Sequence, residues 1–203
     1  MISLLWSLVL FLSAITVHEY AHGWTAYRLG DPTAKLAKRL TLNPLAHMDL
    51  IGTVLLPMTL IWLHSPMLFG WAKPVPINAL ALRHPRRDLI WVGAAGPLAN
   101  LLCAVTLSLV IKGLHLSPES LPTTIITGGI LVNLVLACFN TIPIPPLDGS
   151  RVLLGLLPTP IATIYARVEP YGFLLVLLLL YLGVMNTWIW PTVIWLMRKL
   201  VGP

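Results

Sequence analysis

Residues 1–23, MISLLWSLVLFLSAITVHEYAHG, decide the fold of this protein. The first seventeen residues contain no charged side chain, and two histidines and a glutamate follow them. A helix that crosses a bilayer needs roughly 20 mostly apolar residues, so this stretch predicts a membrane helix over 2–24. At about 1.5 Å per residue, His18 would lie roughly 24 Å along that helix and therefore close to one membrane surface.

The composition of the whole chain indicates the same class. Of the 203 residues, 57% are hydrophobic and 10% are charged, whereas soluble domains carry about a quarter charged residues. Long apolar runs occur at 1–17, 50–63, 89–111, 124–142 and 171–185. We therefore expect an all-α polytopic membrane protein with about four to six transmembrane helices. Its net charge of +6 comes from basic residues in short loops, as in membrane proteins generally, and predicts no nucleic-acid partner.

No stretch outside the apolar runs is long enough for a separate soluble domain. We therefore expect a single membrane-embedded domain over 1–203, with a core at 10–155 and a C-terminal helical region at 156–203.

The topology follows from two basic loops, at 25–49 and 70–88. They would lie on opposite sides of the membrane if 50–69 crossed it. Pro57 and Pro66 interrupt that segment, which favours a re-entrant segment with both loops in the cytoplasm over a crossing helix. Irregular backbone at membrane depth is tolerated only where protein or a water-filled cavity surrounds it, so the re-entrant arrangement predicts such surroundings for 50–69.

Two stretches predict short β elements at the cytoplasmic side. Residues 33–49 are polar and basic and suit a small surface hairpin. In FGWAKPVPIN, 69–78, alternating prolines remove amide donors and so predict an edge strand. An unwound substrate could add to that edge as a further strand, which makes Trp71, Lys73 and Val75 candidate substrate-binding residues.

The HEYAH stretch has the spacing of a zinc site. His18 and His22 are four residues apart, so their imidazoles project from one face of a helix and can bind one metal ion. Glu19 lies on the adjacent face, where it could accept a proton from an attacking water, as in the H-E-x-x-H pattern of metalloproteases. Ionisable residues inside a membrane are costly and usually functional. The alternative is that neighbouring carbonyls satisfy both histidines and Glu19 is buried for packing.

A catalytic zinc site takes three protein ligands and keeps one open position. Asp148 follows the proline-broken end of an apolar run, in PPLDG, where unwound backbone can aim a carboxylate into the membrane interior. An ordinary Asp-Gly turn would have the same sequence. The remaining acidic residues outside HEYAH lie close to the first helix or at predicted helix margins: Asp31, Asp49, Asp88, Glu119 and Glu169.

Three further polar residues lie near these motifs. Asn140 precedes Asp148 by eight residues and is a candidate for stabilising an oxyanion, although a helix–helix hydrogen bond would also explain it. His47 and Asn100 are expected to form structural hydrogen bonds.

Three motifs together resemble the site-2 protease family of intramembrane zinc metalloproteases: HEYAH in an apolar helix, GPLAN in a middle span and FNTIPIPPLDG in a later one. The resemblance covers roughly 10–155. LNPLAHMDLIGT and FGWAKPVPIN further resemble the compact bacterial and archaeal branch. The resemblance implies that His18, His22 and Asp148 bind one zinc ion per chain and that Glu19 is the general base.

The same resemblance implies hydrolysis of peptide bonds in or near the transmembrane segments of membrane protein substrates. The expected location is a prokaryotic inner or plasma membrane, with the active site near the cytoplasmic side of the lipid bilayer. The chain has no recognisable PDZ or CBS domain, so an unknown partner could supply regulation. The main alternative is a metal-ion transporter or channel that uses the same ligands, but it gives Glu19 no particular role. A catalytically dead scaffold would not need the complete set of ligands and base.

Overall fold

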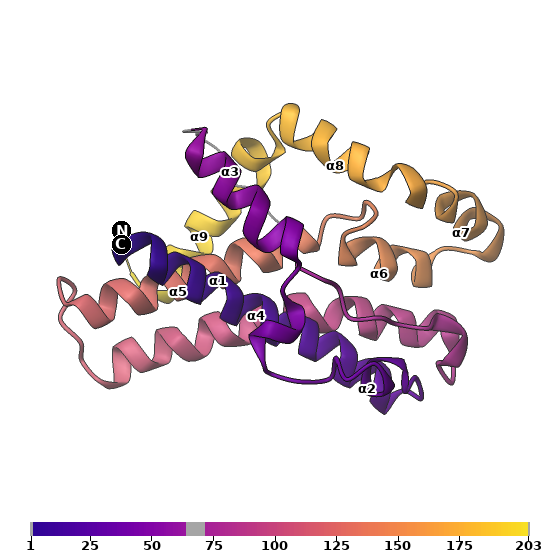
Figure 1. Cartoon of the computed structure of the whole chain (residues 1–203), viewed down its shortest axis with the longest axis horizontal. Helices are drawn as coiled ribbons and strands as arrows, with labels where there is room; N and C mark the ends of the chain where they lie inside the picture. The colour runs from indigo at the N-terminus through magenta and orange to yellow at the C-terminus, as the bar shows by residue number, and fades with distance from the viewer. Residues whose placement is uncertain (1, 64–71, 203) are drawn as a thin grey trace.

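The computed structural model of the protein describes residues 2–63 and 72–202. Within these ranges every regular element is a helix, and no described residue belongs to a β-strand. The longest helices cross one another at the centre of the molecule, and the shorter ones lie around them (Figure 1). The long central helices are α1 (Ile2–Arg28), α4 (Pro85–Gly113) and α5 (Leu121–Asn140), and the short helix α6 (Asp148–Leu156) packs against α4.

Helix α4 holds the centre together, because it packs against α1, α5 and α6. Its buried positions include Val92, Gly96, Asn100 and Ala104. These residues are four apart and therefore share one helix face. Two of them are small, which lets neighbouring helices approach closely, as is typical of membrane helix pairs. This face of α4 also carries Asn100, whose side chain forms hydrogen bonds to α1.

The remaining elements surround this centre. Helix α9 packs against α5, where Ala104, Ile130, Leu134 and Val193 form a buried apolar cluster. The peripheral elements are α2 (Thr33–Leu36), η1 (Pro44–His47), η2 (Leu50–Leu55), α3 (Leu56–Trp62), η3 (Ala79–Ala81), α7 (Thr159–Ala166), η4 (Glu169–Tyr171), α8 (Gly172–Tyr181), η5 (Met185–Ile189) and α9 (Trp190–Leu200).

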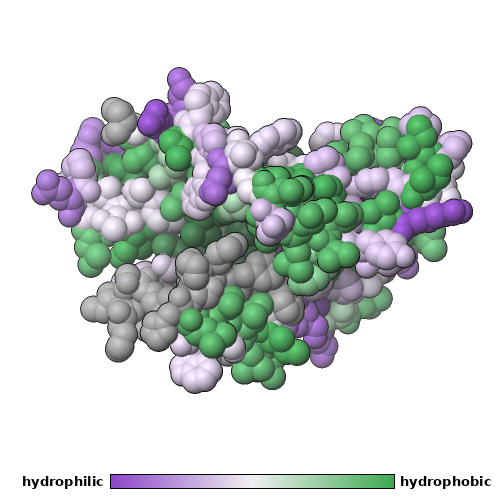
Figure 2. All heavy atoms as spheres, turned by 90° about the horizontal axis from the view of Figure 1, so that it is seen from above, coloured by the Kyte–Doolittle hydropathy of each residue, from purple (hydrophilic) through white to green (hydrophobic). Residues whose placement is uncertain are grey.

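Three helical stretches of the described residues are long and apolar enough to cross a membrane: Pro85–Gly113, Leu121–Asn140 and Thr159–Tyr181. Their outer faces carry exposed leucines, such as Leu102 and Leu174. Figure 2 shows broad hydrophobic areas on the visible face, with hydrophilic side chains gathered nearer its margins. Such continuous apolar surface suits a lipid environment, in agreement with the predicted class of polytopic α-helical membrane protein.

The predicted β elements are not formed by the described residues, so this part of the expected fold is wrong. In place of a hairpin at 33–49, the chain forms α2 and η1. Residues 72–78 are extended but pair with no other strand among the described residues. The physical reason is that Pro74 and Pro76 lack amide donors, and other amides of the segment donate to side chains and loops. Trp71 and the last six residues of the expected re-entrant segment, 64–69, lie outside the described residues.

Hydrogen bonds hold the 72–78 segment against the loop that follows α1. The Lys73 amide donates to the His47 carbonyl at 2.9 Å. The Asn78 amide donates to Asp31 Oδ2 at 2.6 Å, and Asp31 is fully buried. Buried polar groups need such partners. The segment is therefore fixed across the end of α1 that carries HEYAH.

Candidate metal centre

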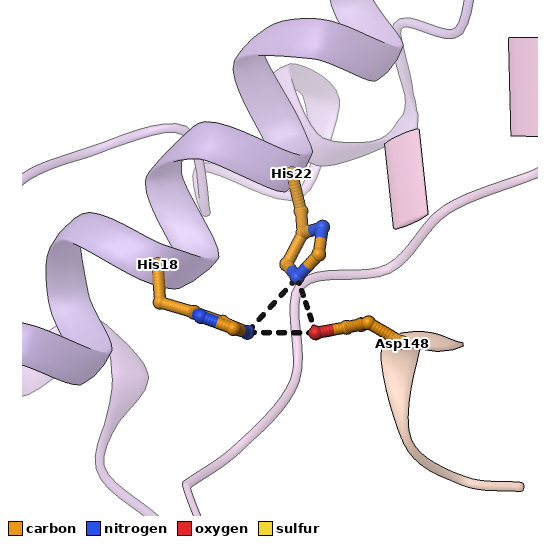
Figure 3. Close-up of side chains that lie close together, drawn as sticks. All are labelled: His18, His22 and Asp148. Carbon is orange, nitrogen blue, oxygen red and sulfur yellow. Dashed lines mark hydrogen bonds and ion pairs between the residues drawn. The ribbon is translucent and has the colours of Figure 1, made fainter. Parts of the chain in front are cut away.

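Three potential ligand atoms converge between α1 and the start of α6 (Figure 3). His18 Nε2 and His22 Nε2 lie 2.9 Å and 3.1 Å from Asp148 Oδ2. The two Nε2 atoms are 3.0 Å apart. All three side chains are buried. The structure thus brings together the two histidines of HEYAH and the aspartate of PPLDG. His18 and Asp148 are 130 residues apart in the sequence.

The outer ring nitrogens show which form each histidine takes. His22 Nδ1 lies 2.6 Å from the Val92 carbonyl oxygen, and His18 Nδ1 lies 2.6 Å from Asn100 Oδ1. A carbonyl oxygen only accepts, so each Nδ1 must carry the proton in these bonds. In the neutral rings, each Nε2 then presents a lone pair toward the other and toward the carboxylate.

Three such acceptors at this distance repel one another unless a proton or a metal cation lies between them. Zinc fits this set, since imidazole nitrogen and carboxylate oxygen are both zinc ligands. Ligand atoms at about 2.0–2.2 Å from a tetrahedral ion would be about 3.3–3.6 Å apart. The observed separations are a few tenths of an ångström shorter. Hydrogen bonds from the outer ring nitrogens to carbonyl groups are the usual support of zinc-binding histidines.

Asp148 reaches the site because the chain breaks after α5. The proline-rich residues 141–147 separate α5 from α6, and Asp148 is the first residue of α6. Gly149 allows this close approach, because a Cβ there would lie 2.5 Å from the Ile142 carbonyl oxygen. Arg151 Nη1 lies 3.4 Å from Asp148 Oδ1, the carboxylate oxygen that is not the one facing the histidines. Arg151 therefore helps to direct the other oxygen, Oδ2, toward the two histidines.

The space beside the histidines exists because α4 has a glycine there. A Cβ on Gly96 would overlap His22 Nε2 and would lie 2.6 Å from His18 Nε2. Helix α4 can consequently pass directly against both imidazoles.

Glu19 is half-buried on α1, beside His18, and it faces the 72–78 segment. Its Oε2 accepts a hydrogen bond of 2.7 Å from the Val75 amide. This contact was not expected, since the sequence placed Val75 in an edge strand whose amides would be available to a substrate. In the structure, the amides of both Lys73 and Val75 already have partners within the protein.

Two other candidate residues, Asn140 and His47, form hydrogen bonds to nearby backbone carbonyls. Asn140 Nδ2 donates to the Leu136 carbonyl of its own helix at 3.0 Å. His47 is buried, and its Nε2 lies 2.8 Å from the Thr41 carbonyl oxygen. Among the described residues, Asp148 is the only carboxylate grouped with the two histidines.

Sequence reasoning missed the part that Asn100 plays in the site. Asn100 was expected to be structural, yet its amide oxygen contacts His18 directly. A signal was present: Gly96 and Asn100 are four residues apart, as are His18 and His22. Because residues four apart lie on the same face of a helix, the face of α4 with Gly96 and Asn100 can pack against the face of α1 with His18 and His22.

Comparison with curated proteins finds relatives along most of the chain. It is 36% identical over 190 residues to "Putative zinc metalloprotease YwhC" of Bacillus subtilis, covering 90% of this chain and 83% of that protein. It is 30% identical over 189 residues to "Putative zinc metalloprotease Rip2" of Mycolicibacterium smegmatis, covering 91% and 70%. A shorter similarity, 31% over 85 residues, covers 41% of this chain and 24% of "Zinc metalloprotease MJ0392" of Methanocaldococcus jannaschii.

No protein-family profile and no solved structure matches the chain. The assignment therefore rests on the curated relatives, which extend well beyond the short HEYAH motif. From this similarity and its coverage, the chain belongs to the site-2 protease family of zinc metalloproteases.

Proposed function

We propose that this protein is a zinc endopeptidase of the membrane, which hydrolyses peptide bonds in or near transmembrane segments of membrane protein substrates. The observation that carries the proposal is the buried cluster of His18, His22 and Asp148, with Glu19 directly beside the first ligand. The relatives named as zinc metalloproteases support the same chemistry. Ionisable groups buried in an apolar helical protein are costly and usually functional.

The three ligands would hold one zinc ion per chain. When bound, zinc supplies Lewis-acid polarisation of the scissile carbonyl oxygen and makes water a stronger acid. Glu19 accepts the proton of the attacking water and passes it to the leaving amine. The Val75 amide orients the Glu19 carboxylate through the bond to Oε2. Asn140 is the candidate donor for the developing oxyanion, because a side-chain amide has two N–H groups and only one is needed for Leu136.

The proposed setting is a prokaryotic inner or plasma membrane, with the site near the cytoplasmic side. Residues 1–203 would form one membrane domain. The 72–78 segment would lie along the substrate path, since it contacts Glu19. Holding a substrate through the amides of Lys73 or Val75 would require those amides to leave their present acceptors. An unknown partner could supply regulation, as noted in the sequence analysis.

A metal-ion transporter could use the same three ligands, but the comparisons do not favour it. The relatives are named metalloproteases. In addition, a transporter gives no function to a carboxylate that a backbone amide holds next to the metal cluster.

Separating the base from the ligands tests the proposal. Glu19→Gln keeps the size of the side chain but cannot accept a proton, so purified protein should retain zinc and lose about 10²–10⁴ in cleavage rate. Asp148→Ala and His18→Ala each remove a ligand, so zinc content itself should fall. The measurements are zinc analysis of the purified variants and cleavage of a transmembrane substrate reconstituted in liposomes. Normal cleavage by Glu19→Gln, or full zinc in Asp148→Ala, would contradict the proposed roles.

A further inference from the structure

We infer that Asn133, on α5, is a positioning residue for zinc: through Asn100 it selects the ring nitrogen of His18 that carries the proton. This inference rests on the proposed role of His18 as a zinc ligand. Asn133 is buried and belongs to a different helix from both His18 and Asn100. It contacts no ligand itself, so its effect must pass through Asn100.

The orientation of the Asn100 amide decides the state of His18. With the oxygen toward His18, as observed at 2.6 Å, Nδ1 carries the proton and Nε2 is free to bind a metal. With the amide reversed, an N–H group would face Nδ1. The proton would then be displaced to Nε2, and the ring could not act as a ligand there. Asn100 is fully buried, so the surrounding protein must determine which orientation is adopted.

Two acceptors hold Asn100 in the productive orientation. Its Nδ2 donates to the Ala14 carbonyl at 3.1 Å and to Asn133 Oδ1 at 2.7 Å. Both N–H groups of the amide are thus used, and the oxygen is left for His18. Reversing the amide would place its oxygen against two other oxygens.

Asn133 could reverse as well, but its own helix prevents it. Its Nδ2 donates to the Gly129 carbonyl, four residues earlier, at 2.9 Å. A backbone carbonyl cannot donate, so Asn133 must keep its nitrogen toward Gly129 and its oxygen toward Asn100. The order of donors and acceptors from Gly129 to His18 is therefore set by the backbone of α5, with the Ala14 carbonyl of α1 supporting it.

The two histidines consequently differ in how they are held. His22 donates directly to the Val92 carbonyl, a backbone group that cannot reverse. His18 depends on two reversible amides in series. Only the His18 side of the site should therefore be sensitive to a change on α5.

The test measures zinc affinity of the full-length protein in detergent by competition with a chelator. Asn133→Leu replaces the amide with an apolar side chain of similar size and so removes the acceptor for Asn100. Zinc should bind about tenfold more weakly, at the lower end of the usual 10–100-fold effect of outer partners, because the Ala14 carbonyl still accepts one N–H. Asn133→Asp in its protonated form can donate to the Gly129 carbonyl and keep an acceptor oxygen toward Asn100, so it should bind zinc more tightly than Asn133→Leu.

Two controls separate positioning from general weakening of the bundle. Ser108→Ala removes another buried interhelical hydrogen bond, from α4 to the Leu200 carbonyl, and should leave zinc affinity unchanged. In an Asn100→Asp background, a carboxylate oxygen accepts from His18 whatever residue occupies position 133. There Asn133→Leu should cost no further affinity, since the two positions are coupled.

Nitrogen-15 NMR of zinc-free protein gives a readout that does not depend on activity. His18 should carry its proton on Nδ1 in wild type and show a mixture of both ring forms in Asn133→Leu. If Asn133→Leu does not fold, Asn133→Ala removes the same acceptor and serves in its place.

An unchanged zinc affinity and ring form in Asn133→Leu would overturn the inference. An equal loss in Ser108→Ala, or an undiminished loss in the Asn100→Asp background, would overturn it too. Wild-type zinc binding and its loss in His18→Ala are measured in the same series. If wild type does not bind zinc, or if His18→Ala still binds it, the proposed metal site itself is rejected. If both results are as expected but Asn133→Leu binds zinc like wild type, only the role of Asn133 is rejected.

Discussion

Gly96 shows how a single residue on α4 shapes the metal centre. Any side chain at this position would enter the space of the two imidazoles. Its helical neighbour Asn100, one turn later, instead supplies a polar atom to His18. Gly96 and Asn100 therefore have different roles on one face of α4. Gly96 leaves space for the two imidazoles, and Asn100 holds the His18 ring through a hydrogen bond.

Gly96→Ala is predicted to lower zinc affinity by at least about tenfold, comparable with the loss of an outer partner of a ligand. The added Cβ would lie 2.6 Å from His18 Nε2, so the ligand or the helix must move. Chelator competition on purified protein measures the effect. Gly113→Ala, on the same helix but with no atom within 4 Å of its added Cβ, is the matched control and should bind zinc normally. Equal affinity for the two variants would show that the site adapts to the methyl group.

At the scale of elements, the 72–78 segment and α1 form one functional unit. Val75 is buried, and a Cβ on Gly23 would lie 3.1 Å from its Cγ1, so the segment rests directly on α1. The Val75 amide donates to Glu19, which lies one turn before Gly23 on α1. An extended segment with two prolines thus contributes one backbone donor at the position of the proposed base.

Val75→Pro should slow cleavage without releasing zinc. The substitution removes the N–H that holds Glu19, and a hydrogen bond to a charged group contributes about 1.5–3 kcal/mol, or roughly 10–100-fold in rate if it serves the transition state. Val75→Ala loses the buried side chain but keeps the N–H, so it should retain most of the activity. Zinc content and substrate cleavage are measured for both. The positioning role fails if Val75→Pro and Val75→Ala, both folded and zinc-loaded, cleave equally well.

For the whole molecule, the contacts between two loops bear on the topology. The Arg83 amide donates to the Leu29 carbonyl at 3.0 Å, and the Asn78 amide donates to Asp31. Loops that share direct hydrogen bonds lie on the same side of a membrane. This supports the proposal that 50–69 enters and leaves the bilayer on one side, which the basic charge of both loops also favours.

Cysteine labelling in closed membrane vesicles tests this arrangement. Leu36→Cys and Leu80→Cys place one thiol in each loop at highly exposed positions without changing the charges that determine topology. Cys103 and Cys138 are first replaced by alanine. Both loops should be labelled from the cytoplasmic side. Ser117→Cys, in the turn between α4 and α5, should react from the opposite side, because α4 is long enough to cross. Labelling of Leu36→Cys and Leu80→Cys from different sides would exclude the proposal.

The sequence alone was sufficient for the class of protein and for the metal-ligand candidates. Long apolar runs predict membrane helices because a helix needs roughly 20 mostly apolar residues to cross a bilayer, and both the length and the composition of a run can be read from the sequence. His18 and His22 could be paired because four residues of helix place two side chains on one face. Asp148 could be proposed because few carboxylates exist in the chain and this one follows a break that prolines impose.

Only the tertiary structure decided which residues support those candidates and how the loops are paired. The bond from Asn100 to His18, its continuation to Asn133 and the bond from Val75 to Glu19 each join helices or segments that are far apart in the chain. An amide N–H can donate to any acceptor that lies within reach. The residue type and its spacing in the sequence therefore do not identify which acceptor it will bond to. The edge strand expected at 69–78 was wrong because the sequence does not identify these acceptors. The amides of the 72–78 segment donate to α1 and to the neighbouring loops, and not to another strand among the described residues.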